Sequence, residues 1–194
     1  MVKTAILILA AGNSSRMGTA KQLLPYKQTT LLGWSIKQAQ KSKAYDVYCV
    51  LGANAETIKK QIDNTSIKII INPNYNDGLS TSIVFGVNYL MDKKIDSILI
   101  MLADQPNVTT NYLNEMLAIY KENPTKTVAS NYKNKTGVPA IFPKTNFNKS
   151  LNLKGDKGAK ELLNEQSSEI IKMKPICLID IDTYEDYQNL SKQG

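Results

Sequence analysis

The N-terminal segment LILAAGNSSRMGTAK, residues 7–21, constrains the fold more than any other part of the chain. An apolar run over residues 4–9 predicts a buried parallel strand, and this strand ends in three small residues, Ala10, Ala11 and Gly12. Glycine adopts backbone conformations that other residues avoid, and small side chains let backbone N–H groups approach a ligand closely. Because successive N–H groups form an anion-binding concavity, the segment favours a polyphosphate ligand at the end of the strand.

Two cations, Arg16 and Lys21, follow this turn and strengthen the case for a phosphate ligand. The segment is not a Walker A loop, because five residues separate Gly12 from Gly18 where that motif has four, and Thr19 stands where it requires lysine. The dinucleotide fingerprint G-x-G-x-x-G is absent as well. The alternative on local evidence is an ordinary turn that needs glycine only for its shape.

The composition narrows the chemistry that the chain can perform. The 194 residues include no histidine, which excludes a His-based triad and an imidazole metal site. A bound metal must then have oxygen ligands, which favours Mg²⁺. The net charge of +7 suits either a solvated lysine-rich surface or the attraction of anionic substrates. The lysines are scattered and form no basic block, so we expect no nucleic-acid partner.

Cys49 and Cys177 are the two cysteines, and both stand in apolar runs. We expect buried thiols in a reducing cytoplasm and neither a disulfide nor a metal pair. Met1 leads almost directly into the first strand, so we expect no signal peptide. We also expect no membrane span, because no apolar run reaches the roughly 20 residues that a membrane helix needs.

Strand-like and helix-like segments alternate along the chain, which predicts an α/β fold with a mostly parallel sheet. We expect a single domain over residues 1–194, in which about residues 131–168 form a substrate-facing region. The expected strands span residues 4–9, 47–51, 67–71, 97–102, 127–130, 139–142, 170–173 and 176–181. The expected helices span residues 30–41, 55–62, 80–91, 110–121, 156–164 and 183–190. We expect Ser80 or Thr81 to open the third helix, and Thr183 with Asp186 to form a weak capping box at the last.

Acidic residues follow two of the expected strands. Asp104, in LADQP, comes just after the apolar run 97–102, and ligands bind at the carboxyl ends of strands in open α/β sheets. A Mg²⁺ ligand is one interpretation of Asp104, and a helix cap or loop carboxylate is the other. In DIDT, alternation along an extended strand puts Asp180 and Asp182 on the same side. Converging carboxylates need a cation or a lysine between them; the alternative is that Asp182 merely caps the last helix.

Two loops complete the candidate site. NPNYNDGLSTS, residues 72–82, joins a strand to a helix and offers amides and hydroxyls suited to a base or ribose. The alternative is a polar loop with a serine cap. GDKGAK, residues 155–160, brings two glycines and two lysines to a helix start, which suits a second phosphate group. A polyphosphate turn, an oxygen-ligand metal site and these two loops are the parts that nucleotidyl transfer requires.

The sequence resembles the MobA-like nucleotidyltransferase superfamily, and within it the molybdenum cofactor cytidylyltransferases. LAAGNSSRMGTAKQLLPY carries the resemblance to the superfamily. VLGANAETI, NPNYNDGLSTSI, LADQP, GVPAIFP, LKGDKGAKELL and DIDTYEDY then follow in the order found in the cytidylyltransferases, so that the likeness covers residues 6–187. It implies a Rossmann-like three-layer α/β/α sandwich of the nucleotide-diphospho-sugar transferase type. Two residues depart from the pattern: Lys160, where arginine is more common and would bind phosphate bidentately, and Tyr184, where proline is usual.

The resemblance also implies a role for each matching residue. The implied nucleotide-binding residues are Leu9, Ala10, Ala11, Gly12, Ser14, Ser15, Arg16, Lys21, Gly52, Ser80, Ser82 and Asp104. Of these, Arg16, Lys21 and Asp104 would be catalytic, with Lys21 stabilising charge near the α-phosphate. The implied Mg²⁺ ligands are Asp104 and Asp182, with Asp180 as the alternative second ligand. The implied acceptor-binding residues are Gly155, Asp156, Lys157, Gly158 and Lys160.

The activity implied by the resemblance is transfer of CMP from CTP to a molybdopterin-type cofactor, with Mg²⁺ and release of pyrophosphate. A molybdenum hydroxylase is the expected recipient of the product. One alternative is a related nucleotidyltransferase that uses another NTP or a sugar or alcohol phosphate acceptor. Another is a non-catalytic carrier of the molybdenum cofactor, which would not need the acidic residues. A nicotinamide-dependent oxidoreductase is a weak third alternative, because the glycine fingerprint is absent.

Overall fold

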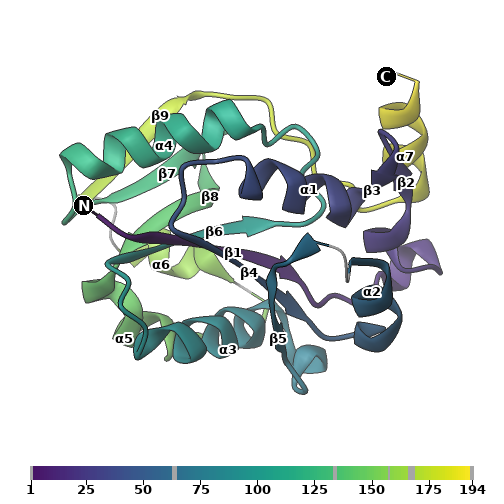
Figure 1. Ribbon diagram of the computed structural model, residues 1–194, viewed down its shortest axis with the longest axis horizontal. Coiled ribbons are helices and arrows are strands. Elements are labelled where there is room, and N and C mark those ends of the chain that lie inside the picture. The colour runs from purple at the N-terminus through teal and green to yellow at the C-terminus, as the bar shows by residue number, and fades with distance from the viewer. Residues whose placement is uncertain (1, 63–64, 133–134, 157, 166–168, 193–194) are drawn as a thin grey trace.

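The structure, a computed structural model, describes residues 2–62, 65–132, 135–156, 158–165 and 169–192. The strands of its central sheet are β1 (Thr4–Ala10), β4 (Asp46–Leu51), β5 (Lys68–Ile71), β6 (Ser97–Leu102), β7 (Thr127–Asn131), β8 (Thr136–Pro143) and β9 (Ile170–Pro175). These seven strands lie in the order β5-β4-β1-β6-β8-β7-β9, and among them only β8 runs antiparallel to its neighbours (Figure 1). The predicted mostly parallel sheet is therefore confirmed.

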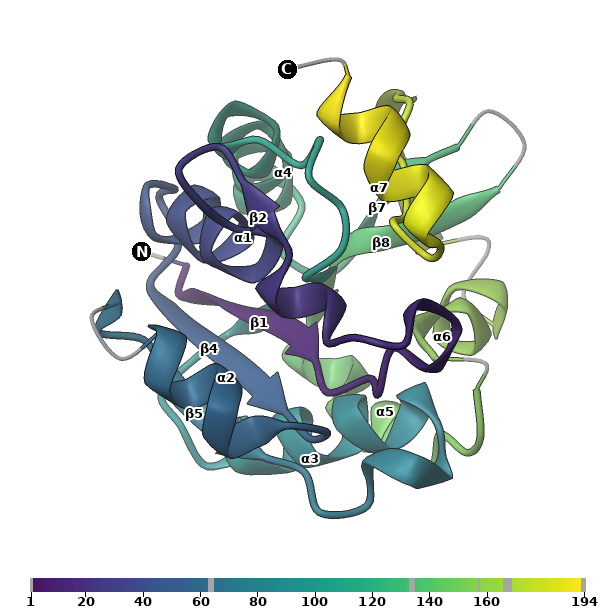
Figure 2. The same ribbon diagram turned by 90° about the vertical axis from the view of Figure 1, so that its right-hand side faces the viewer.

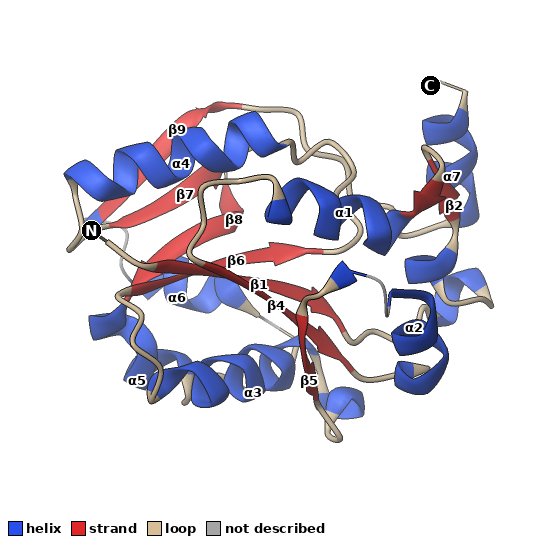
Figure 3. Cartoon of the chain, viewed as in Figure 1, coloured by secondary structure: helices blue, strands red, loops and turns tan. Residues whose placement is uncertain are grey.

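Helices cover both faces of this sheet (Figure 3). They are α1 (Leu31–Gln40), α2 (Ala55–Ile62), α3 (Leu79–Met91), α4 (Thr110–Glu122), α5 (Phe147–Ser150), α6 (Ala159–Glu165) and α7 (Tyr184–Ser191). Successive side chains of a strand point to opposite faces, so Ile6 and Ile8 of β1 pack with α1, α2 and α4, whereas Leu7 packs with α3, α5 and α6. Every residue of β1 is buried. The result is the predicted three-layer α/β/α sandwich.

The C-terminal helix packs near the carboxyl end of β1. A small hairpin, β2 (Pro25–Tyr26) and β3 (Thr29–Thr30), lies beside α7 in Figure 1, and Figure 2 shows α7 at the front of the molecule. Leu31, Ile181 and Leu190 form a small core between them, and the Tyr187 hydroxyl donates a 2.8 Å hydrogen bond to the carbonyl of Pro25. Residues 181–190 are thereby held next to the segment that follows the N-terminal turn.

Hydroxyl caps begin several of the helices. Thr30 caps α1 by accepting a 3.0 Å hydrogen bond from the backbone N–H of Gly33. The predicted capping box of α7 is confirmed: Thr183 Oγ1 accepts from the N–H of Asp186, and Asp186 Oδ2 accepts from the N–H of Thr183. Such caps satisfy backbone N–H groups that have no partner inside the helix, so these helix starts are encoded locally.

The predicted strand over residues 176–181 is wrong. β9 ends at Pro175, and the N–H of Ile176 makes a last hydrogen bond to the carbonyl of Asn131. The chain then leaves the edge of the sheet and crosses toward its carboxyl end, where the N–H of Ile181 donates to the carbonyl of Asp104. As a consequence Cys177 is exposed, contrary to prediction, whereas Cys49 on β4 is buried as expected.

Two predicted helix starts also differ. The helix expected to begin at residue 156 begins at Ala159, because Gly158 has a φ of +56° and the Asp156 carboxylate instead accepts a hydrogen bond from the N–H of Leu79. Gly78, and neither Ser80 nor Thr81, is the N-cap of α3. The β2–β3 hairpin and the short helix α5 have no counterpart in the predicted elements. Among the described residues, no helix is long and apolar enough to cross a membrane.

Candidate active site

A cavity of about 610 Å³ opens where β1 and β6 end, which is where open α/β sheets bind ligands. This volume falls within the range of small-molecule sites. It is lined by the end of β1 and the turn after it, by the loop before α3, by the end of β6, and by acidic residues from the C-terminal part. The lining residues are Leu9, Ala10, Ala11, Gly12, Asn13, Ser15, Lys21, Gln22, Leu31, Tyr75, Asn76, Gly78, Leu79, Ser82, Leu102, Ala103, Asp104, Asp156, Asp180 and Asp182.

The small-residue turn forms one wall of the cavity. A Cβ atom added at Gly12 would meet nothing within 4 Å, so this glycine leaves open space at the wall. Its backbone does not use the left-handed conformation that the sequence suggested for it; Ser14 and Gly18 do, with φ of +55° and +64°. The buried side chain of Gln22 donates to the carbonyls of Ala10 and Gly12 at 3.0 and 2.8 Å. The turn is therefore held in shape from behind by a side chain.

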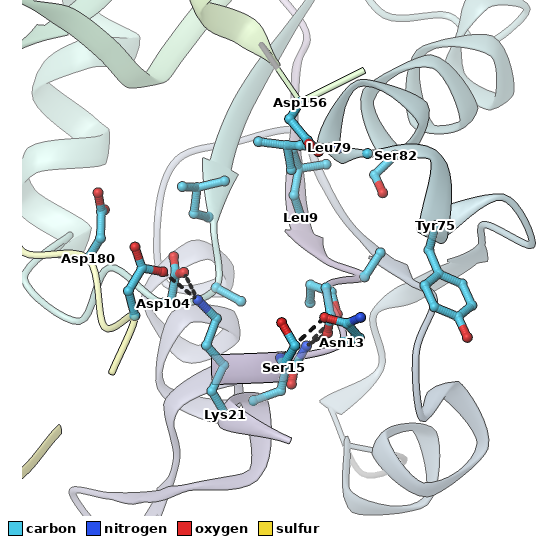
Figure 4. A pocket seen from close by; sticks show the side chains of 18 of the residues that line it. Leu9, Asn13, Ser15, Lys21, Tyr75, Leu79, Ser82, Asp104, Asp156 and Asp180 are labelled. Atoms are coloured by element: carbon cyan, nitrogen blue, oxygen red, sulfur yellow. Dashed lines mark hydrogen bonds and ion pairs between the residues drawn. The ribbon is translucent and has the colours of Figure 1, made fainter. Parts of the chain in front are cut away.

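Lys21 reaches across the cavity to the carboxylates. It begins the short helix η2 (Lys21–Leu23), and its Nζ donates to Asp104 Oδ2 at 2.5 Å, to Asp182 Oδ1 at 3.2 Å and to the carbonyl of Ile181 at 3.1 Å (Figure 4). Burial lowers the pKa of Lys21, but attraction to Asp104 and Asp182 outweighs it and leaves the pKa raised. The ammonium group is thus fully protonated at neutral pH and acts as a fixed positive charge.

Asp104 is largely buried, and only one of its two carboxyl oxygens is paired with Lys21. Its pKa is raised chiefly by burial, and the nearby carboxylates of Asp180 and Asp182 raise it further, whereas Lys21 opposes the shift. Its Oδ1 atom is buried and has no hydrogen-bond partner among the described residues. Buried polar atoms in proteins almost always have a hydrogen-bond partner, so this oxygen is available to bind a cation or to accept a hydrogen bond from a ligand.

Asp180 is held by a buried amide. Gln105 Nε2 donates to Asp180 Oδ1 at 2.8 Å and to the Tyr132 hydroxyl at 2.9 Å, while Gln105 Oε1 has no partner within the described part of the chain. Asp104, Asp180 and Asp182 line the same cavity, yet over the described ranges no three acidic or thiol side chains converge closely enough to form a ready-made metal cluster. The ammonium group of Lys21 lies between Asp104 and Asp182 instead.

The loop before α6 is tied to the start of α3. The N–H of Ser80 donates to the carbonyl of Gly155 at 3.0 Å, the N–H of Leu79 to Asp156 Oδ1 at 3.3 Å, and the N–H of Gly158 to Ser80 Oγ at 3.2 Å. The N-cap of α3 makes no side-chain hydrogen bond, so the first two of these bonds satisfy backbone N–H groups in its first turn. Residues 72–82 and 155–160, the two loops predicted to complete the site, are therefore joined directly, although they lie far apart in the sequence.

The structure brings many of the predicted site residues to the cavity. These are Leu9, Ala10, Ala11, Gly12, Ser15, Lys21, Ser82, Asp104, Asp156, Asp180 and Asp182. Lys157 and the side chain of Arg16 lie outside the described part of the structure. Nine residues of the lining were missed as individual site residues: Asn13, Gln22, Leu31, Tyr75, Asn76, Gly78, Leu79, Leu102 and Ala103. Tyr75 and Asn76 belong to the loop predicted to contact a base, so its polar composition was the available signal, whereas a buried glutamine such as Gln22 has no local signature.

Some predicted residues do not reach the cavity. Ser80 is fully buried and bonded to Gly158, so the prediction that it contacts nucleotide is not supported by its position. Gly52 lies behind the wall, where an added Cβ would come within 2.5 Å of Tyr75 and 2.8 Å of a backbone carbonyl oxygen. Ser14 lines a second cavity of about 330 Å³ on the far side of the turn. Gly155, Gly158 and the exposed Lys160 are also absent from the lining.

Comparison with known proteins identifies relatives over different shares of the chain. "Purine catabolism protein PucB" of Bacillus subtilis (strain 168) is 31% identical over 93% of this chain and 92% of that protein. "Nicotine blue oxidoreductase" of Paenarthrobacter nicotinovorans is 28% identical over 59% of this chain and 56% of that protein. "Molybdenum cofactor cytidylyltransferase" of Escherichia coli (strain K12) is 39% identical over 40% of each chain.

Solved structures match almost the entire chain. The crystal structure of Rv0371c from Mycobacterium tuberculosis H37Rv has a TM-score of 0.87 and 27% identity over 98% of both chains. A complex of the same protein with manganese has a TM-score of 0.84 and 25% identity over the full length of both. The sequence itself matches the MobA-like NTP transferase domain over residues 6–170. The chain therefore belongs to the MobA-like NTP transferase family and is a nucleotidyltransferase.

Proposed function

We propose that this nucleotidyltransferase moves CMP from CTP to the terminal phosphate of a molybdopterin-type cofactor and releases pyrophosphate. One observation carries the proposal: the Lys21 ammonium is held 2.5 Å from Asp104, across one cavity from a turn of small residues. Nucleotidyl transfer needs both of these elements. Hydrogen-bond donors bind the leaving pyrophosphate, and a fixed positive charge stabilises the negative charge that develops around the reacting phosphorus.

The acidic side of the cavity fits a divalent cation. Asp104 Oδ1 is buried without a partner, and Asp180 and Asp182 line the same space. An all-oxygen donor set suits Mg²⁺ or Mn²⁺, and the related Rv0371c has been crystallised with manganese. We propose that Asp104 holds Mg²⁺, with Asp182 or Asp180 as its second protein ligand. When bound, the ion neutralises charge on the phosphate oxygens.

The residues of the chain then have distinct tasks. Backbone N–H groups of the turn at Ala10, Ala11 and Gly12, together with Ser15, hold the β- and γ-phosphates. Lys21, protonated because its pKa is raised, stabilises the charge that develops at the α-phosphate. An oxygen of the acceptor phosphate forms the new bond to the α-phosphorus, and the bond to the α–β bridging oxygen breaks as pyrophosphate leaves. The acceptor is already an anion, so no strong general base is needed.

The two joined loops are proposed to select the nucleoside and the acceptor. Tyr75, Asn76 and Ser82 line the cavity on the nucleoside side. Asn72, which is fully buried, donates to Ser82 Oγ at 3.0 Å and orients that hydroxyl. Asp156 lines the cavity on the acceptor side, where it is proposed to face the pterin. The similarity to the Escherichia coli cytidylyltransferase supports the choice of CTP and of this acceptor.

Pyrophosphate release tests the proposal directly. The protein is incubated with Mg²⁺ or Mn²⁺ and each of CTP, GTP and ATP, with and without molybdenum-loaded pterin. Release with CTP only in the presence of the pterin is the expected result. Release with another nucleotide, or with a sugar or alcohol phosphate, would keep the chemistry and refute the proposed substrates. Binding of the pterin without turnover in any mixture would favour a carrier that passes the cofactor to a molybdenum hydroxylase.

A matched pair of variants links this activity to the site. Asp104→Ala removes the proposed metal ligand, and we expect turnover to fall by about 10²-fold or more while cooperative unfolding is retained. Asp92→Ala removes an exposed aspartate at the C-terminal end of α3, outside the lining of the cavity, and should retain wild-type turnover. Wild-type activity of Asp104→Ala would contradict the assignment.

We also propose that the protein is located in the cytoplasm, where Cys49 and Cys177 remain free thiols.

A further inference from the structure

The side chain of Gln22 makes all of its hydrogen bonds to residues of the N-terminal turn. It is 3% exposed, although it stands at the wall of the cavity. Its Nε2 donates to the carbonyls of Ala10 and Gly12 at 3.0 and 2.8 Å, and its Oε1 accepts from Ser14 Oγ at 3.3 Å. A primary amide has two N–H donors, and both are used. Gln22 therefore has no donor left for a ligand, and any effect on the ligand must pass through the turn.

The carbonyl oxygens of the turn are all directed to protein donors. Those of Ala10 and Gly12 bind Gln22, and that of Ala11 accepts from the N–H of Ala53 at 3.0 Å. Each peptide unit is planar, so anchoring a carbonyl also fixes the direction of the N–H in the same unit. A carbonyl oxygen that turned toward the cavity would repel a phosphate oxygen, because both carry negative charge. The anchored turn avoids this repulsion.

We infer that Gln22 is a positioning residue for polyphosphate: it holds the carbonyls of Ala10 and Gly12 away from the ligand and leaves the backbone N–H groups to bind it. This inference rests on the proposed nucleotide site. It means that an uncharged side chain contributes to the affinity for the triphosphate, in addition to the cations Arg16 and Lys21. A neutral amide suits the task, because a cation here would compete for the phosphates and a carboxylate would repel them.

Gln22→Met tests the inference, since methionine has a similar length and donates no hydrogen bond. Gln38→Met is the matched control: Gln38 is also a buried amide, its Oε1 accepts from the N–H of Thr110 at 2.8 Å, and it does not line the cavity. Binding of inorganic triphosphate and of CTP, each with Mg²⁺, is measured by calorimetry. We expect Gln22→Met to weaken both ligands by the same factor, about 10- to 100-fold. The control should stay within about twofold of wild type.

Turnover gives a second readout that a merely structural role would not move. The KM for the nucleotide should rise in Gln22→Met by the factor seen in binding, whereas the KM for the acceptor should stay at its wild-type value. Gln22→Glu provides a further variant if the methionine variant does not fold. An ionised glutamate keeps the length and the acceptor oxygen but cannot donate, so it should weaken triphosphate at least as much.

Each outcome decides a different question. A wild-type protein that binds neither triphosphate nor CTP would refute the proposed nucleotide site itself. A wild type that binds both, alongside a folded Gln22→Met or Gln22→Glu that binds within about threefold of it, would overturn only the role of Gln22. That role is equally overturned if Gln38→Met loses as much affinity, or if CTP alone is weakened, because the effect would then be general or confined to the nucleoside.

Discussion

Removal of the Lys21 ammonium group should destabilise the fold in a pH-dependent way. Lys21→Met keeps the side-chain length but removes the ammonium group that pairs with Asp104, whose side chain is 14% exposed and lies near Asp180 and Asp182. Loss of one partner from a buried ion pair costs about 3–5 kcal/mol. Because water in the open cavity screens the Lys21–Asp104 pair, we expect its loss to cost about 2 kcal/mol of stability. Loss of the pair with Asp182, whose side chain is 48% exposed, should cost less than about 1 kcal/mol. We expect a loss of about 2–3 kcal/mol in the free energy of unfolding at neutral pH.

The sign of the pH dependence follows from the raised pKa of Asp104. A carboxyl whose pKa is higher in the folded than in the unfolded protein supports folding below the unfolded value, and this support is lost as the pH rises through the folded value. Lys21 opposes the rise, so Lys21→Met raises that pKa further. The deficit of the variant relative to wild type should therefore be largest above neutrality, and it should shrink as the pH falls, because the Asp104 carboxyl takes up a proton at a higher pH in the variant than in the wild type.

Denaturant and thermal unfolding in a metal chelator, at about pH 8 and about pH 5, measure both effects. At the higher pH the melting temperature of Lys21→Met should lie about 5–10 °C below that of wild type. Lys121→Met, at an exposed lysine near the end of α4, is the matched control and should change stability by less than about 0.5 kcal/mol. In turnover, Lys21→Met should lose about 10²- to 10³-fold.

The reasoning would be refuted by equal deficits at both pH values, because the unneutralised carboxylate of Asp104 would then not be their cause. It would equally be refuted if Lys21→Met were as stable as wild type at the higher pH. A deficit shared by Lys121→Met would assign the effect to net charge rather than to the cavity.

Three further perturbations test other parts of the structure. Gly52→Ala would put a Cβ 2.5 Å from that of Tyr75, so we expect a loss of about 1–3 kcal/mol in thermal denaturation, and an unchanged melting curve would contradict the packing. Cys177 is exposed, whereas burial raises the pKa of Cys49 to about 12; a thiol reagent should therefore label one cysteine in the native protein and both after unfolding. Thr183→Ala removes the cap of α7 and should cost about 1 kcal/mol, seen as faster amide exchange in that helix; unchanged exchange would deny the cap its role.

Much of the fold is predictable because its signals are local. The apolar runs that became β1, β4 and β6 are near-continuous, as expected for strands buried on both faces. The capping box at Thr183 depends on residues three apart. The strand predicted at residues 176–181 was wrong for the opposite reason. Ile179 and Ile181 are apolar because they pack with the hairpin and α7, and Leu178 because it packs in the main core, and none of the three pairs in the sheet.

The candidate site could be predicted only in part. Asp104 was identified from its place after a central strand, and it does line the cavity. Ser80 was misplaced, because its hydroxyl contacts Gly158, a residue 78 positions away that the sequence does not mark as a neighbour. Gln22 and Gln105 went unnoticed, since a buried glutamine is recognised only from the carbonyls and carboxylates that surround it.

The sequence by itself determined the alternation of strands and helices, the small-residue turn, and the types of side chain available to the site, because these depend on short-range periodicity and composition. Only the tertiary structure decided that Lys21 lies between Asp104 and Asp182, from which it is separated by 83 and 161 residues. It also decided that an amide anchors the turn. Such contacts arise where the carboxyl ends of parallel strands meet a returning C-terminal segment, and no local pattern encodes that meeting.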